Sequence, residues 1–155
     1  FVIAPHKTDA KTIEALQKSL QKPFALYSRR KDTDLQDATV LIVDTIGLLT
    51  QIYRYADLAY VGGGFATGLH NTLEPAVFGV PVLIGPQYQG FREAEEMVSA
   101  GGIRVVKGAA EFASQTDDLM ENPRLRAELG SVNSGYIEKN KGASDQILAG
   151  IRRLL

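Results

Sequence analysis

The chain has 155 residues, 45% of them hydrophobic, and its formal net charge is −1 at pH 7. This size and composition predict one folded domain with a sizeable core, and the nearly balanced charge gives no sign of a nucleic-acid or anionic-membrane partner. The sequence holds no cysteine, which excludes a disulfide framework and a cysteine-based zinc site.

The first third of the chain predicts three strands and one helix. Strands are predicted at 1–4, 24–27 and 39–43, where apolar residues follow one another. Asp9 is predicted to cap a helix that extends to Leu20, because apolar residues recur there at helical spacing. The chain starts at Phe1, inside the first apolar run, which suggests a piece of a larger protein whose partner domain is absent.

The remaining two thirds continue the alternation of strands and helices. Asp44 and Thr45 are predicted to cap a helix at 46–56. Further strands are predicted at 58–61, 81–84 and 103–106, and further helices at 71–78, 91–100, 109–120, 123–139 and 144–155. This alternation predicts an α/β fold with a parallel sheet of five or six strands and helices on both faces.

A glycine turn follows the predicted strand 58–61 and is the strongest local pattern. Gly62, Gly63, Gly64 and Gly68 leave room for a ligand, and the helix start after them offers free N–H groups to an anion. The pattern therefore favours a phosphate-bearing ligand, although a tight turn alone would also explain the glycines. It is not a dinucleotide fingerprint, because Thr67 stands where the last glycine would be, and no P-loop lysine follows.

The carboxyl ends of parallel strands meet at one edge of a sheet, where ligands bind. We therefore expect His6, Thr45, the glycine turn and Gln87 to face a common ligand. Glu74, three residues after Asn71, has two interpretations of about equal weight. It closes a capping box with Asn71, or its two carboxylate oxygens accept hydrogen bonds from a ribose diol.

The two histidines, His6 and His70, fit either a hydrogen-bonded structural role or the positioning of a ligand. No tightly bound transition metal is expected, since neither histidine has a second histidine or a cysteine at ligand spacing. No catalytic nucleophile is predicted, because catalytic triads assemble in space and cannot be identified from sequence order.

Several strings resemble the carboxyl-terminal half of the 3-deoxy-D-manno-octulosonic acid (Kdo) transferases. They run from residue 1 to about residue 93 in the family's order, and the His-Asn-x-Leu-Glu-Pro-Ala string is the most specific. The strings are Ile3-Ala-Pro5, Val43-Asp-Thr-Ile-Gly47, Gly63-Gly64, Gly68-Leu-His-Asn-Thr-Leu-Glu-Pro-Ala76, Gly79-Val-Pro-Val82, Gly85-Pro86 and Phe91-Arg-Glu93.

The resemblance implies a Rossmann-like donor-binding domain, the carboxyl-terminal half of a two-domain glycosyltransferase of the GT-B class. Enzymes of this family transfer Kdo from CMP-Kdo to a lipid A precursor at the cytoplasmic face of the bacterial inner membrane, in lipopolysaccharide biosynthesis. No cofactor and no metal are implied. The general base and the acceptor surface belong to the amino-terminal half, which is absent from this chain, so the chain alone should be inactive.

The resemblance also implies which residues contact the CMP donor. His6 and Lys7 stand where the family commonly has Arg, and Leu48 replaces an acidic residue. For Glu74 the resemblance favours ribose binding. The implied donor-binding residues are Pro5, His6, Ile46, Gly47, Leu48, Gly63, Gly64, His70, Asn71, Thr72, Leu73 and Glu74.

Two other functions remain open on the sequence alone. One is another GT-B glycosyltransferase, or a nucleotide-sugar epimerase, that uses a UDP-linked donor. The other is a non-catalytic nucleotide-binding module, in which the same glycine turn senses a ligand and drives assembly. Preference for CMP over UDP would separate the Kdo transferase from the first, and a ligand-dependent change of oligomeric state would reveal the second.

Overall fold

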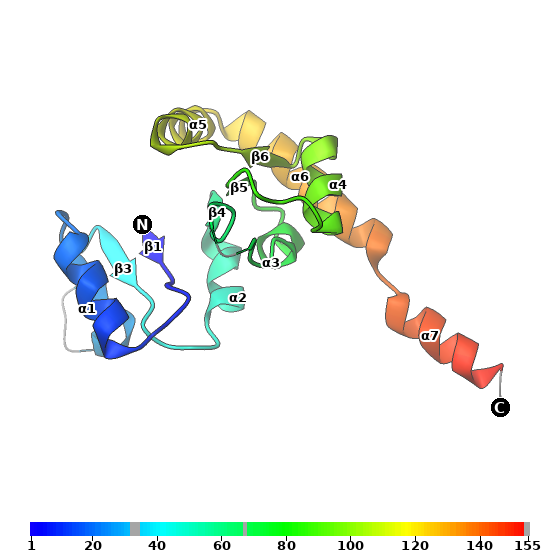
Figure 1. Ribbon diagram of the computed structural model, residues 1–155, viewed down its shortest axis with the longest axis horizontal. Coiled ribbons are helices and arrows are strands. Elements are labelled where there is room, and N and C mark those ends of the chain that lie inside the picture. Colours follow the sequence, from blue (N-terminus) through cyan, green and yellow to red (C-terminus); the bar gives the residue numbers. More distant parts are fainter. Residues whose placement is uncertain (32–34, 67, 154–155) are drawn as a thin grey trace. The chain divides into compact units, whose positions relative to one another are not determined.

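The computed structural model describes residues 1–31, 35–66 and 68–153, without the side chains of 143–146. The chain forms two compact units, 1–52 and 53–155, and each contains one three-stranded parallel sheet (Figure 1). The sequence predicted one sheet of five or six strands. The α/β class and the parallel pairing are confirmed, but the six strands are divided between two sheets.

Unit 1 contains sheet A, whose strand order is β1-β3-β2. Asp9 caps α1 as predicted, since its carboxylate accepts a hydrogen bond from the Thr12 amide at 3.0 Å. Ile13 of α1 is buried against Val40 and Ile42 of β3. The elements are β1 (Val2–Ile3), α1 (Ala10–Ser19), β2 (Phe24–Leu26), η1 (Tyr27–Arg29), β3 (Val40–Ile42) and α2 (Leu49–Ile52).

Unit 2 contains sheet B, in which the strands follow the chain in the order β4-β5-β6. The helices predicted at 91–100, 109–120 and 123–139 are present, and Gly101, with φ +88°, ends the first of them. The elements are η2 (Tyr53–Tyr55), β4 (Ala59–Val61), α3 (Leu73–Val77), β5 (Val82–Ile84), α4 (Arg92–Ala100), β6 (Ile103–Val105), α5 (Ala109–Glu121), α6 (Pro123–Asn140) and α7 (Ala143–Arg152).

The predicted helix at 46–56 is wrong in its first part. α2 begins only at Leu49, and a 3₁₀ turn replaces the helix from Tyr53. Gly47 adopts φ +89°, a left-handed conformation that does not belong in an α-helix. Asp44 does not cap this segment, because its carboxylate accepts hydrogen bonds from the Ser28 amide at 2.9 Å and the Ser28 hydroxyl at 2.5 Å. The predicted end of the last helix, Leu155, lies outside the described residues.

The two faces of sheet B are covered by different helices. Side chains alternate between the faces along a strand, so Val82 and Ile84 face the opposite way from Leu83. The first two belong to a core cluster with residues of α3 and α4, and Leu83 belongs to a second cluster with residues of α5 and α6 (Figure 1). All three side chains of β5 are fully buried.

A buried amide fixes α6 to the loops beside sheet B. The Asn133 side chain is fully buried, and its Nδ2 donates to the backbone oxygens of Val80 and Gly102, each at 2.9 Å. Close by, α6 approaches the end of α3 backbone to backbone, because a Cβ at Gly130 would lie 2.0 Å from the Gly79 oxygen. These contacts hold the scaffold on which β4 and α3 present the candidate site.

Candidate functional site

The glycine turn closes on itself at the carboxyl end of β4. The His70 amide donates to the Gly62 oxygen at 3.0 Å, which brings the far end of the loop back to its start. Gly63 has φ +93°, and a Cβ there would lie 2.0 Å from the Gly68 oxygen. The loop backbone therefore requires glycine at position 63, whether or not a ligand is bound.

The glycine turn also contacts the loop after β5. A Cβ at Gly64 would lie 2.9 Å from the Gly85 Cα, and one at Gly85 would lie 2.6 Å from the Gly64 oxygen. The Gln87 amide donates to the Gly64 oxygen at 2.9 Å. The expectation that the turn and Gln87 meet at one edge is confirmed within unit 2. The close approach that requires glycine at position 64 is between two protein loops.

Asn71 and Glu74 form a linked pair at the start of α3. Asn71 Oδ1 accepts a hydrogen bond from the Leu73 amide at 3.0 Å, and its Nδ2 donates to Glu74 Oε1 at 3.2 Å. This differs from a capping box, in which each side chain would bond to the other residue's backbone amide. Asn71 therefore serves the helix start and, with the same side chain, orients the Glu74 carboxylate.

Tyr53 of η2 lies within the electrostatic influence of Glu74. Burial, together with the negative charge of Glu74, raises the pKa of the Tyr53 hydroxyl to about 12. The Tyr53 hydroxyl is therefore protonated at neutral pH and adds no second negative charge beside the Glu74 carboxylate. Sequence reasoning missed Tyr53, since only its place in space relates it to Glu74.

Two residues of the predicted donor-binding string face inwards. The Thr72 side chain is 1% exposed, and its hydroxyl finds no hydrogen-bond partner among the described residues. Leu73 packs against the core cluster beneath α3. Thr72 therefore has only its backbone to offer a ligand in this conformation. The exposed side chains of the string are those of His70 and Asn71.

The other predicted residues lie in unit 1, at the ends of two neighbouring strands. Pro5 and His6 follow β1, and Ile46, Gly47 and Leu48 follow β3, which is the strand paired with β1. Ile46 is 88% exposed, whereas Leu48 is half-buried. The structure thus brings the predicted residues together in two groups, one at the carboxyl edge of each sheet.

Asp44 fixes the loop that carries Ile46 and Gly47. Burial by itself raises the pKa of this carboxyl, but the side-chain and backbone hydrogen bonds from Ser28 outweigh burial, and the pKa is lowered below its ordinary value. Asp44 is therefore ionised at neutral pH and joins the end of β3 to η1. Its environment makes it a structural carboxylate.

In the ranges 1–31, 35–66 and 68–153, no three His, Asp or Glu side chains gather where they could hold a metal ion. Every helix in those ranges is too short or too polar to span a bilayer.

Parallel strands flanked by helices, with a glycine turn at a strand end, define an α/β domain of the Rossmann-like kind. The same fold is found in the crystal structure of the C-terminal CMP-Kdo binding domain of WaaA from Acinetobacter baumannii. The TM-score is 0.77 at 20% identity, and the match covers 88% of this chain and 72% of that one.

Sequence relatives identify the family. The chain is homologous to the 3-deoxy-D-manno-octulosonic acid transferases, and the resemblance seen in its motifs is confirmed. It is 31% identical over 152 residues to the enzyme of Chlamydophila psittaci, a match that covers 97% of this chain and 35% of the relative. The chain is 37% identical over 122 residues to the Chlamydia trachomatis serovar D enzyme, a match that covers 76% of this chain and 26% of that enzyme.

The Haemophilus influenzae transferase is 30% identical over 134 residues, a match that covers 83% of this chain and 31% of that enzyme. None of the protein-family models matches the chain. The chain spans about a third of the length of the curated relatives that it matches.

Proposed function

We propose that this chain is the donor-binding domain of a Kdo transferase and that its CMP-Kdo site includes the carboxyl edge of sheet B. The observation that carries the proposal is the Asn71–Glu74 pair at the carboxyl end of β4, in a chain that aligns with the transferases over nearly its whole length. A site at this edge of a parallel sheet is where nucleotides bind in α/β folds.

Each part of the site has a chemical role in this proposal. The Glu74 carboxylate, held by the Asn71 amide, accepts hydrogen bonds from the ribose diol of CMP. Backbone N–H groups of the glycine turn donate to the phosphate. His70, whose ring lies beside Gly62 and Gly63, adds a ring donor at the same end of β4.

The resemblance also implies donor contacts in unit 1. Pro5, His6 and the backbone of 46–48 lie at the ends of neighbouring strands and would contact the nucleotide, with Lys7 supplying a positive charge near the phosphate. No residue of this chain is assigned the role of nucleophile or general base.

The transfer reaction is proposed for the longer polypeptide of which this chain would be one half. The amino-terminal half would hold the lipid A precursor and the general base, at the cytoplasmic face of the inner membrane, in lipopolysaccharide biosynthesis. The acceptor hydroxyl attacks the anomeric carbon of Kdo, the bond from that carbon to the CMP phosphate breaks, and the hydroxyl proton passes to the base. Closure of the two halves would align these atoms and exclude water.

An NMR titration of the 155-residue chain with CMP, UMP and ADP tests the proposal. CMP is expected to shift the resonances of residues 62–64 and 71–74 at lower concentration than UMP or ADP. Glu74→Gln removes the charge that accepts the ribose hydrogen bonds and should weaken CMP binding about tenfold. Glu121→Gln, an exposed position on α5, is the matched control and should bind CMP as the parent chain does.

Three results would contradict the proposal. Stronger binding of UMP would favour a transferase or epimerase that uses a UDP-linked donor. Equal CMP affinity in the Glu74→Gln and Glu121→Gln chains would remove Glu74 from the site. A change of sedimentation coefficient on addition of nucleotide would favour the non-catalytic module.

A further inference from the structure

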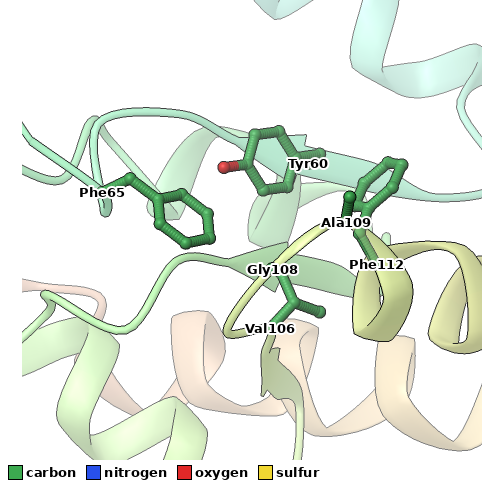
Figure 2. A pocket seen from close by; sticks show the side chains of 6 residues that line it. All are labelled: Tyr60, Phe65, Val106, Gly108, Ala109 and Phe112. Atoms are coloured by element: carbon green, nitrogen blue, oxygen red, sulfur yellow. The ribbon is translucent and has the colours of Figure 1, made fainter.

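Three exposed aromatic side chains gather on one face of sheet B. Tyr60 is 42% exposed, Phe65 is 46% exposed and Phe112 is 39% exposed. We call these three residues the aromatic patch. They line an apolar hollow of about 240 Å³, and Figure 2 shows the Tyr60 ring between Phe65 on one side and Phe112 on the other. The remaining lining residues are Val106, Gly108 and Ala109.

The aromatic patch lies where the helix cover of this face is incomplete. Tyr60 of β4 lies directly beside Leu83 of β5 in the sheet register, so the two side chains share a face. Leu83 is fully buried beneath residues of α5 and α6, whereas Tyr60 is 42% exposed and is contacted from α5 by Phe112. The Tyr60 and Phe112 rings meet edge to face, with their centroids 5.4 Å apart.

The strand that carries Tyr60 is also open along one side. β4 is the end strand of sheet B and, in the described part of unit 2, pairs only with β5. The Ala59 amide donates to the Pro81 oxygen, and since amides alternate along a strand, the Tyr60 amide points to the open side. An unpaired edge beside an exposed apolar face is a ready-made site for another strand.

The chemistry of the hollow does not suit a small polar ligand. The Tyr60 hydroxyl is the only polar side-chain group among the lining residues. A small-molecule site combines an apolar cavity with several converging polar groups that fix the ligand's orientation. The combination seen here, an apolar face joined to an unpaired strand edge, matches what a further strand and helix of a protein would bury.

We propose that the open edge of β4 pairs with a strand of the longer transferase polypeptide outside this chain, and that the helix following this strand covers the aromatic patch. The inference rests on the proposed function in taking the chain as part of a longer enzyme. Its relatives are about three times as long, and the solved CMP-Kdo binding domain is not covered completely, since the match spans 72% of it.

The handedness of parallel connections specifies the face on which the helix lies. The connection from β4 through α3 to β5 leads in one direction and places α3 on the face of Ala59 and Val61. Crossovers between parallel strands are right-handed. The proposed strand lies on the other side of β4, and the connection that follows it leads away from β4, opposite to the direction from β4 to β5. A right-handed crossover in that direction places its helix on the opposite face of the sheet, above Tyr60.

Alkylation of a single introduced cysteine tests whether a helix covers the aromatic patch in the longer transferase. The chain has no native cysteine, so Ala109→Cys places its only thiol in the lining of the hollow. Ser114→Cys is the matched control, because it is exposed on the same helix but does not line the hollow. We expect similar alkylation rates at both sites in the 155-residue chain. In the longer transferase, with its native cysteines replaced by serine, position 109 should react at least about tenfold more slowly than position 114.

Amide hydrogen exchange tests the strand pairing separately. The Tyr60 amide should exchange quickly in the 155-residue chain and slowly in the longer transferase, while the Leu83 amide of the central strand is protected in both. The inference is overturned if position 109 and the Tyr60 amide behave alike in the two proteins. It is also overturned if both are already protected in the 155-residue chain, by the chain itself or by a second copy that sedimentation would reveal.

The same inference fails if the gene encodes no further α/β segment beside this chain. Its failure can be told apart from failure of the donor assignment. The CMP titration concerns residues 62–64 and 71–74, whereas the labelling and exchange experiments concern positions 109 and 60, so each result stands without the other.

Discussion

Sheets A and B have the same strand number and the same parallel pairing, yet they differ in how deeply they are buried. All three residues of β5 in sheet B are fully buried, whereas Leu41 of β3 in sheet A is half-buried and Val2 of β1 is 51% exposed. The sequence runs that form β3 and β5 are equally apolar. The difference teaches that the depth of burial depends on helix cover. Helices cover both faces of sheet B, whereas sheet A is covered by α1.

The largest effect is expected where α6 is fixed beside sheet B. Asn133→Asp replaces the amide donor with a carboxylate that faces two backbone oxygens in a fully buried position, at an expected cost of about 4 kcal/mol at pH 7. Urea unfolding measures this loss. Because burial favours the neutral acid, the variant's deficit should shrink as the pH falls towards the unfolded pKa of about 3.9. Asn140→Asp, exposed on the same helix, is the control, and an equal loss there would contradict the account.

A core substitution compares the two sheets directly. Leu83→Ala removes a fully buried side chain of β5 and should reduce the free energy of unfolding by about 3 kcal/mol, because the cavity between sheet and helices cannot collapse. Leu41→Ala, at the half-buried position of β3, should cost about 1 kcal/mol. Both are measured by urea denaturation of the 155-residue chain. Equal losses would show that the difference in burial has no energetic consequence.

The contact between the two loops at the site predicts a smaller effect. Gly64→Ala would place a Cβ 2.9 Å from the Gly85 Cα, so one loop must move, at an expected cost of about 2 kcal/mol. CMP affinity should fall together with stability, because the same loop presents the amides that we propose bind the phosphate. Gly108→Ala is the control, since that Cβ meets nothing within 4 Å and the backbone there is extended. Unchanged stability of Gly64→Ala would contradict the close contact.

The smallest effect is expected in unit 1, at the pair of Asp44 and Ser28. The pKa of Asp44 is lowered in the folded chain, so its stabilising contribution is present above the unfolded pKa of about 3.9 and is lost as the pH falls through the folded pKa. Ser28→Ala removes the hydroxyl donor and should cost about 1 kcal/mol at pH 7, a figure reduced by partial exposure. The deficit should vanish in acid. A deficit that persists at pH 2 would mean that packing, not the charge, was lost.

The elements of the fold could be predicted from the sequence because their patterns are local. Asp9 marks a helix start by its capping side chain, Gly101 marks a helix end by its left-handed backbone, and the apolar runs mark the strands. Strand pairing could not be predicted. β3 lies between β1 and β2 in sheet A, an order that depends on contacts between residues far apart in the chain.

The candidate site was predicted in part. The resemblance indicated Asn71 and Glu74, and the structure joins them by a hydrogen bond. The helix predicted from Ile46 failed because Gly47 adopts a left-handed conformation, which a sequence pattern does not reveal. Asp44 was predicted to cap that helix, but its partner Ser28 is 16 residues away, beyond the reach of local rules.

The mutual contact of Gly64 and Gly85 has a consequence for how this site can evolve or be engineered. A side chain added at one position needs space at the other, and the other is already occupied by the smallest residue. No second substitution within the pair can compensate for the first. Position 64 and position 85 therefore cannot be substituted singly or together. A library that randomises these two loops should keep both glycines fixed and place its diversity at Gln87, which is exposed.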